Sequence, residues 1–145
     1  MNILIDGDAC PVIGITEQVA KSQHIPVTII VDYNHRIHSD YSEVITVEQG
    51  NDSADFELIG RVLPQDIVIT QDYGVASLAL AKGAYALHQS GKEYTLENID
   101  LLLFERHLSK KQRTSGGKKH LKPIPKRTDK DDTYFKEQLI KLCMR

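Results

Sequence analysis

The chain has 145 residues, a length typical of one domain, and 41% of them are hydrophobic, which is enough to build one sizeable core. No stretch approaches the roughly 20 apolar residues that a membrane-spanning helix needs, and the N-terminus MNILIDGD lacks a signal-peptide pattern, so we expect a cytoplasmic protein with no membrane partner. The net charge of -2 hides two unequal parts, because residues 1–105 carry 5 Lys/Arg against 16 Asp/Glu and residues 106–145 carry 13 against 4.

The first part of the chain alternates between strand and helix patterns. Residues 2–5 form a short apolar run that ends at Asp6, which predicts a buried strand. Apolar residues then recur at helical spacing over 11–22, beginning at a proline that suits a first helical turn. Residues 26–31 and 43–47 are further strand candidates. One strand-helix-strand unit is therefore expected near the N-terminus.

The same alternation continues in the middle of the chain. A helix is predicted over 53–63, and a second apolar strand over 66–70 is followed closely by Asp72. Residues 74–82 are rich in Ala and Leu and predict a helix, and 84–87 can form another strand. The apolar face of the 53–63 helix is expected to consist of Phe56, Ile59, Val62 and Leu63.

The last third begins with a predicted helix from Thr95 and then becomes strongly basic. Residues 106–130 are rich in Gly, Pro and Lys and predict a loop, after which Asp131 or Asp132 can cap a final helix over about 131–144. The core-facing residues of the Thr95 helix are expected to be Leu96, Ile99, Leu102, Leu103 and Leu108.

Strands that alternate with helices favour an α/β fold, here a three-layer α/β/α sandwich with a mostly parallel sheet. We expect a single domain over residues 1–145. Ligands of such sheets bind outside the carboxyl ends of the strands.

Acidic residues follow two of the predicted strands. Asp6 and Asp8 stand two apart after the first, and Asp72 follows a later one, so a right-handed crossover topology can bring the three together. Two carboxylates about 4 Å apart repel by roughly 4 kcal/mol at an effective dielectric near 20, so a converged cluster needs a cation or a shared proton. Hard oxygen ligands favour Mg²⁺ or Mn²⁺, which can polarise a phosphate and activate water.

Each acid also has a purely structural explanation. Asp8 can cap the helix that follows it, and Asp72 can be a turn residue before Gly74. Asp52 and Asp55 are three apart at a helix start, where Asp52 is the better candidate for the cap. Spacing alone leaves Asp55 open between a capping role and a place at the sheet edge.

Three motifs resemble the uncharacterised bacterial YaiI/YqxD family, namely DGDACP at 6–11, NDSADFELI at 51–59 and the run from 66 to 87 that contains T-x-D. The similarity continues through 94–103 and the basic segment. The T-x-D motif and the small-residue helix after it also resemble the wider PIN-like and NYN ribonuclease superfamily.

This resemblance implies a metal-dependent nuclease with a parallel sheet between helices. By motif, Asp6 matches the first-strand acid, Asp55 the helix acid and Asp72 the acid of T-x-D, which makes these three the implied catalytic residues. Asp8 is an additional ligand candidate of the closer family, and Gly7 stands where we would expect Ala.

Ten Lys/Arg lie between residues 106 and 130 against one acid, Asp129. A flexible cationic strand suits the backbone of RNA, with weak sequence preference because the segment has no aromatic residue. A solvated surface loop, or mutual neutralisation of the two charged halves, are the structural alternatives. The residues to which we assign nucleic-acid binding are Lys110, Lys111, Arg113, Lys118, Lys119, Lys122, Lys126 and Arg127.

Two other groups are weaker candidates. Cys10 lies close to the acids, but no base is placed beside it by sequence, and a small buried thiol is the commoner role. His35 and His38 have a possible metal spacing without partner ligands, and Cys143 has no C-x-x-C partner.

The leading hypothesis is a Mg²⁺- or Mn²⁺-dependent nuclease that hydrolyses phosphodiester bonds in RNA. One alternative is a haloacid-dehalogenase-like phosphatase with Asp6 as nucleophile, although Cys10 stands where that motif prefers Thr or Val. The other is a non-catalytic RNA-binding module in which the acids only cap and turn.

Overall fold

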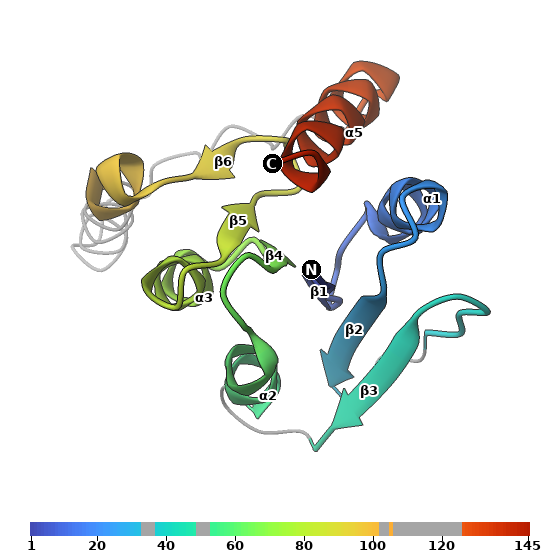
Figure 1. Ribbon diagram of the computed structural model, residues 1–145, viewed down its shortest axis with the longest axis horizontal. Coiled ribbons are helices and arrows are strands. Elements are labelled where there is room, and N and C mark those ends of the chain that lie inside the picture. Colours follow the sequence, from blue (N-terminus) through green and yellow to red (C-terminus); the bar gives the residue numbers. More distant parts are fainter. Residues whose placement is uncertain (33–36, 49–52, 102–104, 106–125) are drawn as a thin grey trace, which may run out of the picture.

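A single six-stranded sheet organises the chain in the computed structural model, which describes residues 1–32, 37–48, 53–101, 105 and 126–145 (Figure 1). The strand order is β3-β2-β1-β4-β5-β6. The strands from β1 to β5 pair in parallel, and β6 runs antiparallel to β5. The bounds are β1 (Ile3–Asp6), β2 (Val27–Asp32), β3 (Glu43–Val47), β4 (Ile67–Ile69), β5 (Tyr85–Leu87) and β6 (Glu93–Tyr94).

Helices lie on both faces of this sheet. Figure 1 shows α1 and α5 together on one side and α2 and α3 on the other. The bounds are α1 (Ile13–Ser22), α2 (Ser53–Arg61), α3 (Tyr73–Ala81) and α5 (Asp129–Cys143), and residues 96–101 are also helical. The expected α/β class with a mostly parallel sheet is therefore confirmed. Among the described residues, no helix has the length and apolar character needed to cross a membrane.

The core is divided between the two faces. Ile3 and Ile5 of β1 pack with α1 and α5, whereas Leu4 between them packs with α2 and α3. This alternation follows from the period of two in a strand, and it explains why β1 reads as a continuous apolar run. Both faces of β1 are therefore buried under helices.

The apolar face predicted for α2 is partly wrong. Leu58 and Val62 are buried on the sheet, while Phe56 is 76% exposed and Leu63 is 60% exposed. Two apolar stripes overlap in this helix, and the packed one follows the i, i+4 spacing of 54, 58 and 62. Phe56 consequently points away from the core.

The C-terminal part of the fold differs from expectation in three details. The strand β6 has no counterpart among the predicted elements, because two residues make no periodic pattern. Helix α5 begins at Asp129, and Thr128 caps it in a capping box with Asp131, so neither Asp131 nor Asp132 is the N-cap. Ile99 is buried as expected, but Leu96 is 71% exposed. Leu102, Leu103 and Leu108 lie outside the described residues.

Candidate functional site

A pocket of about 780 Å³ lies at the carboxyl edge of the sheet, where β1 meets β4. From β1 the chain continues to β2 and β3 on one side, and it later returns to place β4 and β5 on the other. The pocket therefore sits at the topological switch point, where open α/β sheets bind ligands. It is lined by Asp6, Asp8, Ala9, Ala54, Asp55, Gln71, Asp72 and Tyr73. All four aspartates singled out from the sequence face one space.

Asp6, the last residue of β1, is the most perturbed carboxyl of the pocket. Burial raises its pKa from 3.8 to about 6, a hydrogen bond from Thr70 opposes the rise, and the charges of Asp55, Asp8 and Asp72 add to it. The negative charges of the other three aspartates therefore disfavour ionisation of Asp6. Such mutual repulsion is what a bound cation relieves.

Thr70 ties the acids of the two central strands together. Its hydroxyl donates to Asp6 Oδ2 at 3.1 Å and accepts from the backbone nitrogen of Asp72 at 3.0 Å. Its carbonyl accepts from the Tyr94 hydroxyl at 3.2 Å. Tyr94 belongs to the unforeseen strand β6, and its ring lies edge-on to Tyr73, with 5.8 Å between centroids. Sequence reasoning missed both supports, although Thr70 is the Thr of the T-x-D motif.

Asp8 is placed by the turn after β1, which presses closely on β2. The nitrogen of Gly7 donates to Ile30 O at 2.8 Å, and a Cβ at position 7 would stand 2.6 Å from Val31 Cγ1. Only glycine fits such an approach without displacement, which accounts for Gly7 where Ala was expected.

The capping role considered for Asp8 is wrong. The N-cap of α1 is Val12, and no side-chain capping hydrogen bond is formed there among the described residues. Instead, Asp8 Oδ1 accepts from the backbone nitrogen of Asp32 at 3.3 Å. Asp32 ends β2 at the same end of the sheet, and no motif or spacing in the sequence marks it as a site residue.

Asp72 has a structural role and a place in the pocket at once. It is the N-cap of α3, and its Oδ1 accepts from the nitrogens of Gly74 at 2.7 Å and Val75 at 3.2 Å. Asp55 lies in the first turn of α2 and also lines the pocket. Asp52, considered as the cap of α2, lies outside the described residues.

The donor chemistry of the pocket suits a hard divalent ion, since carboxylate oxygens are the ligands that Mg²⁺ and Mn²⁺ prefer. Within the described residues, however, no group of three or more His, Cys, Asp or Glu side chains is arranged so that it could hold a metal ion. The four aspartates share a pocket without forming a coordination shell. An ion held by three of them therefore requires their side chains to close in.

The geometry does not favour the two weaker candidates. Burial raises the pKa of the Cys10 thiol, which keeps it protonated and a poor nucleophile. His38 contacts Asp40, with 3.2 Å between Nε2 and Oδ1, at the exposed surface. Its companion His35 lies outside the described residues.

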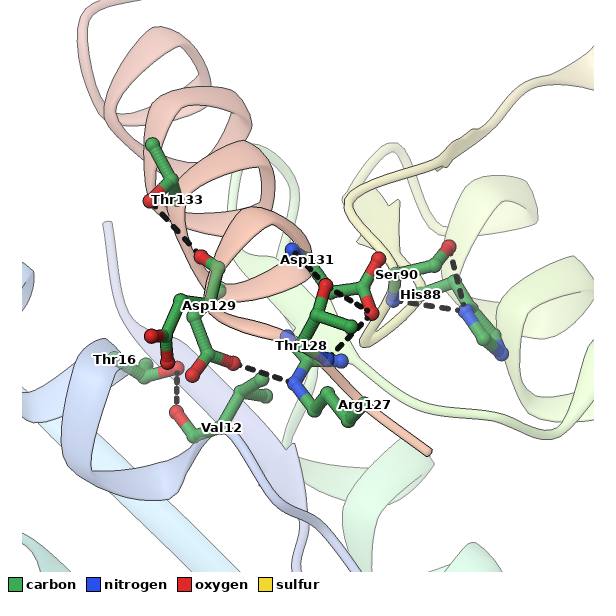
Figure 2. Close-up of polar contacts among 10 residues, drawn as sticks. Val12, Thr16, His88, Ser90, Arg127, Thr128, Asp129, Asp131 and Thr133 are labelled. Carbon is green, nitrogen blue, oxygen red and sulfur yellow. Dashed lines mark hydrogen bonds and ion pairs between the residues drawn. The ribbon is translucent and has the colours of Figure 1, made fainter. Parts of the chain in front are cut away.

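Most of the predicted RNA-binding residues, from Lys110 to Lys122, lie outside the described residues. Lys126 is exposed, and Arg127 forms an ion pair with Asp132 at the start of α5. Figure 2 shows Arg127 near the turn that carries His88, whose pKa is lowered by burial and by the charge of Arg127. His88 directly follows β5, so a positive charge stands near the same sheet edge as the acids.

A family model described as "Uncharacterized BCR, YaiI/YqxD family" matches residues 4–145. A UPF0178 protein of Clostridium acetobutylicum is 50% identical over 145 residues, which cover 100% of this chain and 98% of that protein. A UPF0178 protein of Alkaliphilus oremlandii is 52% identical over 140 residues, covering 97% and 89% respectively. No solved structure matches the chain.

Proposed function

The chain belongs to the YaiI/YqxD family, and we propose from the chemistry of its own pocket that it is a PIN-like, metal-dependent nuclease that hydrolyses phosphodiester bonds in RNA. One observation carries this proposal: four aspartates from β1, the turn after it, α2 and the N-cap of α3 line a single pocket at the switch point of a parallel sheet. Carboxylates that share one pocket repel one another, and a divalent cation is a natural counter-charge for such a group.

Each of the four pocket aspartates would have a role in the metal site that follows from its position. Asp6 and Asp72 hold the centre of the site, because Thr70 fixes the first through its hydroxyl and accepts from the backbone of the second. Asp55 closes the site from α2, and Asp8 from the turn after β1. Mg²⁺ or Mn²⁺ bound among these carboxylates would supply Lewis acidity toward a phosphate oxygen and an acidified water.

The division of charge supports a polyanionic substrate. The residues before 106 carry a net charge of -11, and those from 106 onward carry +9. A nucleic-acid backbone is attracted by the basic part, while the acidic part accepts it only where a cation neutralises the carboxylates. RNA binding by the basic segment and cleavage at the acidic pocket are thus parts of one proposal.

The test is cleavage of a 5′-labelled single-stranded RNA by the purified protein with Mg²⁺, Mn²⁺ or EDTA. We expect metal-dependent scission that falls at least about a hundredfold in Asp6→Asn and in Asp72→Asn, in the range by which loss of one charge-stabilising group slows catalysis. Asp100→Asn is the matched control, because Asp100 is exposed and lies outside the pocket. Equal cleavage by the wild type and Asp6→Asn contradicts the proposal.

The same experiment separates the two alternatives. A phosphatase that uses Asp6 as nucleophile would release terminal phosphate without cutting the chain and would form a phosphoaspartate. A binding module would show salt-sensitive RNA binding with no metal dependence and no product.

A further inference from the structure

A second cavity, of about 390 Å³, lies between α2 and α3 directly beside the acidic pocket. Its volume falls in the range of roughly 300 to 1,000 Å³ that small-molecule sites occupy. The two helices contact each other and pack on the same face of the sheet. The groove is lined by Asp55, Phe56, Ile59, Asp72, Gly74, Val75 and Leu78.

The groove presents apolar surface that the fold does not use. Val75 belongs to the core cluster under α2 and α3, and Ile59 is partly buried against that cluster. Phe56 and Leu78 on its walls are 76% and 53% exposed. An exposed aromatic ring beside a concave apolar surface offers a flat face on which one base can stack.

The groove and the acidic pocket share a border. Asp55 and Asp72 line both of them, and Phe56 directly follows Asp55 in the first turns of α2. Gly74 lines the groove beside Asp72, and a Cβ at position 74 would stand 3.0 Å from Asp72 Oδ1. A ligand with a phosphate in the pocket thus has its next chemical group at the mouth of the groove.

We propose that this groove binds one nucleobase of a single-stranded RNA, stacked on Phe56, next to the phosphate that the aspartates receive. The proposal rests on the proposed nuclease function and adds its substrate class. A base in a duplex is stacked on both faces and paired, so bringing it into the groove requires unstacking and unpairing that a single strand largely avoids. Apart from the two border carboxylates, the lining side chains are apolar, so the base identity matters little.

The test measures binding of a single-stranded RNA that contains 2-aminopurine, whose fluorescence is quenched on stacking. Asp6→Asn protein with Mn²⁺ is used so that the RNA stays intact. We expect Phe56→Ala in this background to weaken binding about tenfold, which corresponds to about 1.4 kcal/mol, and to reduce the quenching. Phe56→Leu keeps apolar contact without a flat ring, so its affinity for the RNA should lie between those of the parent protein and Phe56→Ala.

The matched control is Leu96→Ala, since Leu96 is 71% exposed but outside the groove. Its binding and quenching should equal those of the parent. Binding by Phe56→Ala equal to that of the parent overturns the proposal, as does duplex RNA of the same sequence that binds as tightly as the single strand.

The outcome for the groove is distinguishable from the outcome for the nuclease. If only the groove proposal fails, wild type and Phe56→Ala cleave single strands with the same kcat/KM while Asp6→Asn is inactive. If only the nuclease proposal fails, no variant cleaves, but binding and quenching still depend on Phe56.

Discussion

The hydroxyl of Thr70 donates a hydrogen bond of 3.1 Å to the carboxylate of Asp6, which joins the end of β4 to the end of β1. The same oxygen accepts from the nitrogen of Asp72, the residue that caps α3. One buried hydroxyl therefore fixes the relative positions of two of the four pocket acids. Loss of the Thr70 hydroxyl should therefore change both the stability of the protein and the pKa of Asp6.

Thr70→Val keeps the shape of the side chain and removes both hydrogen bonds. The backbone nitrogen of Asp72 then loses its acceptor, which should lower the free energy of unfolding by about 1–3 kcal/mol. Because the Thr70 hydrogen bond lowers the pKa of Asp6, cleavage in the variant should reach half its maximum at a higher pH. Thr70→Ser restores the hydroxyl and should restore the pH profile. An unchanged profile in Thr70→Val argues against Thr70 as a positioning residue.

Asp6 should make the metal-free protein less stable as the pH rises. Its pKa is about 6 in the folded chain against 3.8 in the reference state, so between these values the folded protein holds a proton that the unfolded chain has lost. The free energy of unfolding should fall on the order of 2 kcal/mol between pH 4 and pH 7, with a discount for partial exposure.

Asp6→Asn lacks this titration, so its stability relative to the wild type should rise over the same interval. Urea unfolding at pH 4.5 and pH 7.5 in EDTA measures the difference, and Asp100→Asn serves as the exposed control. A difference between wild type and Asp6→Asn that is the same at both pH values is the contrary result.

Gly7→Ala should be strongly destabilising for its size. The new methyl would stand 2.6 Å from Val31 Cγ1 and 2.7 Å from Ile29 Cγ2, and overpacking of this kind costs about 1–3 kcal/mol. Gly14→Ala is the matched control, because nothing lies within 4 Å of its added Cβ in α1 and it should stabilise the helix by up to about 1 kcal/mol. Equal melting temperatures of the two variants would mean that the turn after β1 can shift to accommodate the methyl group, which contradicts the prediction.

Lys126 should contribute to RNA binding through charge alone. If Lys126 neutralises one phosphate, Lys126→Ala should make the log-log salt dependence of single-stranded RNA binding shallower by about 0.7. Lys126→Arg should keep the slope, and Lys21→Ala, an exposed lysine at the end of α1, should leave it unchanged. The same slope in wild type and Lys126→Ala excludes contact of Lys126 with the backbone.

Sequence patterns predict the site residues whose positions depend on where a strand ends. A buried parallel strand is a continuous apolar run, so the ends that carry Asp6 and Asp72 are visible in the sequence, and the pairing of β1 with β4 brings them together. Asp55 is different, because its position depends on how α2 packs, and only the family resemblance pointed to it.

The remaining features depend on tertiary packing. The sequence of α2 contains two overlapping apolar stripes, and contact with the sheet selects the one that buries Leu58 and leaves Phe56 outside. Strand β6 is too short for any periodic signal, yet its Tyr94 supports Thr70. Local patterns do not encode such long-range contacts.

The four pocket aspartates should act together as one metal site, which titration of Mn²⁺ followed by electron paramagnetic resonance tests most directly. Wild-type protein and Asp100→Asn should remove free Mn²⁺ from solution equally well. Asp6→Asn should bind at least about tenfold more weakly, since the loss of even a supporting group costs a metal site that much. Binding of Mn²⁺ with the same affinity by the wild type and Asp6→Asn, or no binding by either, would contradict a metal centre in this pocket.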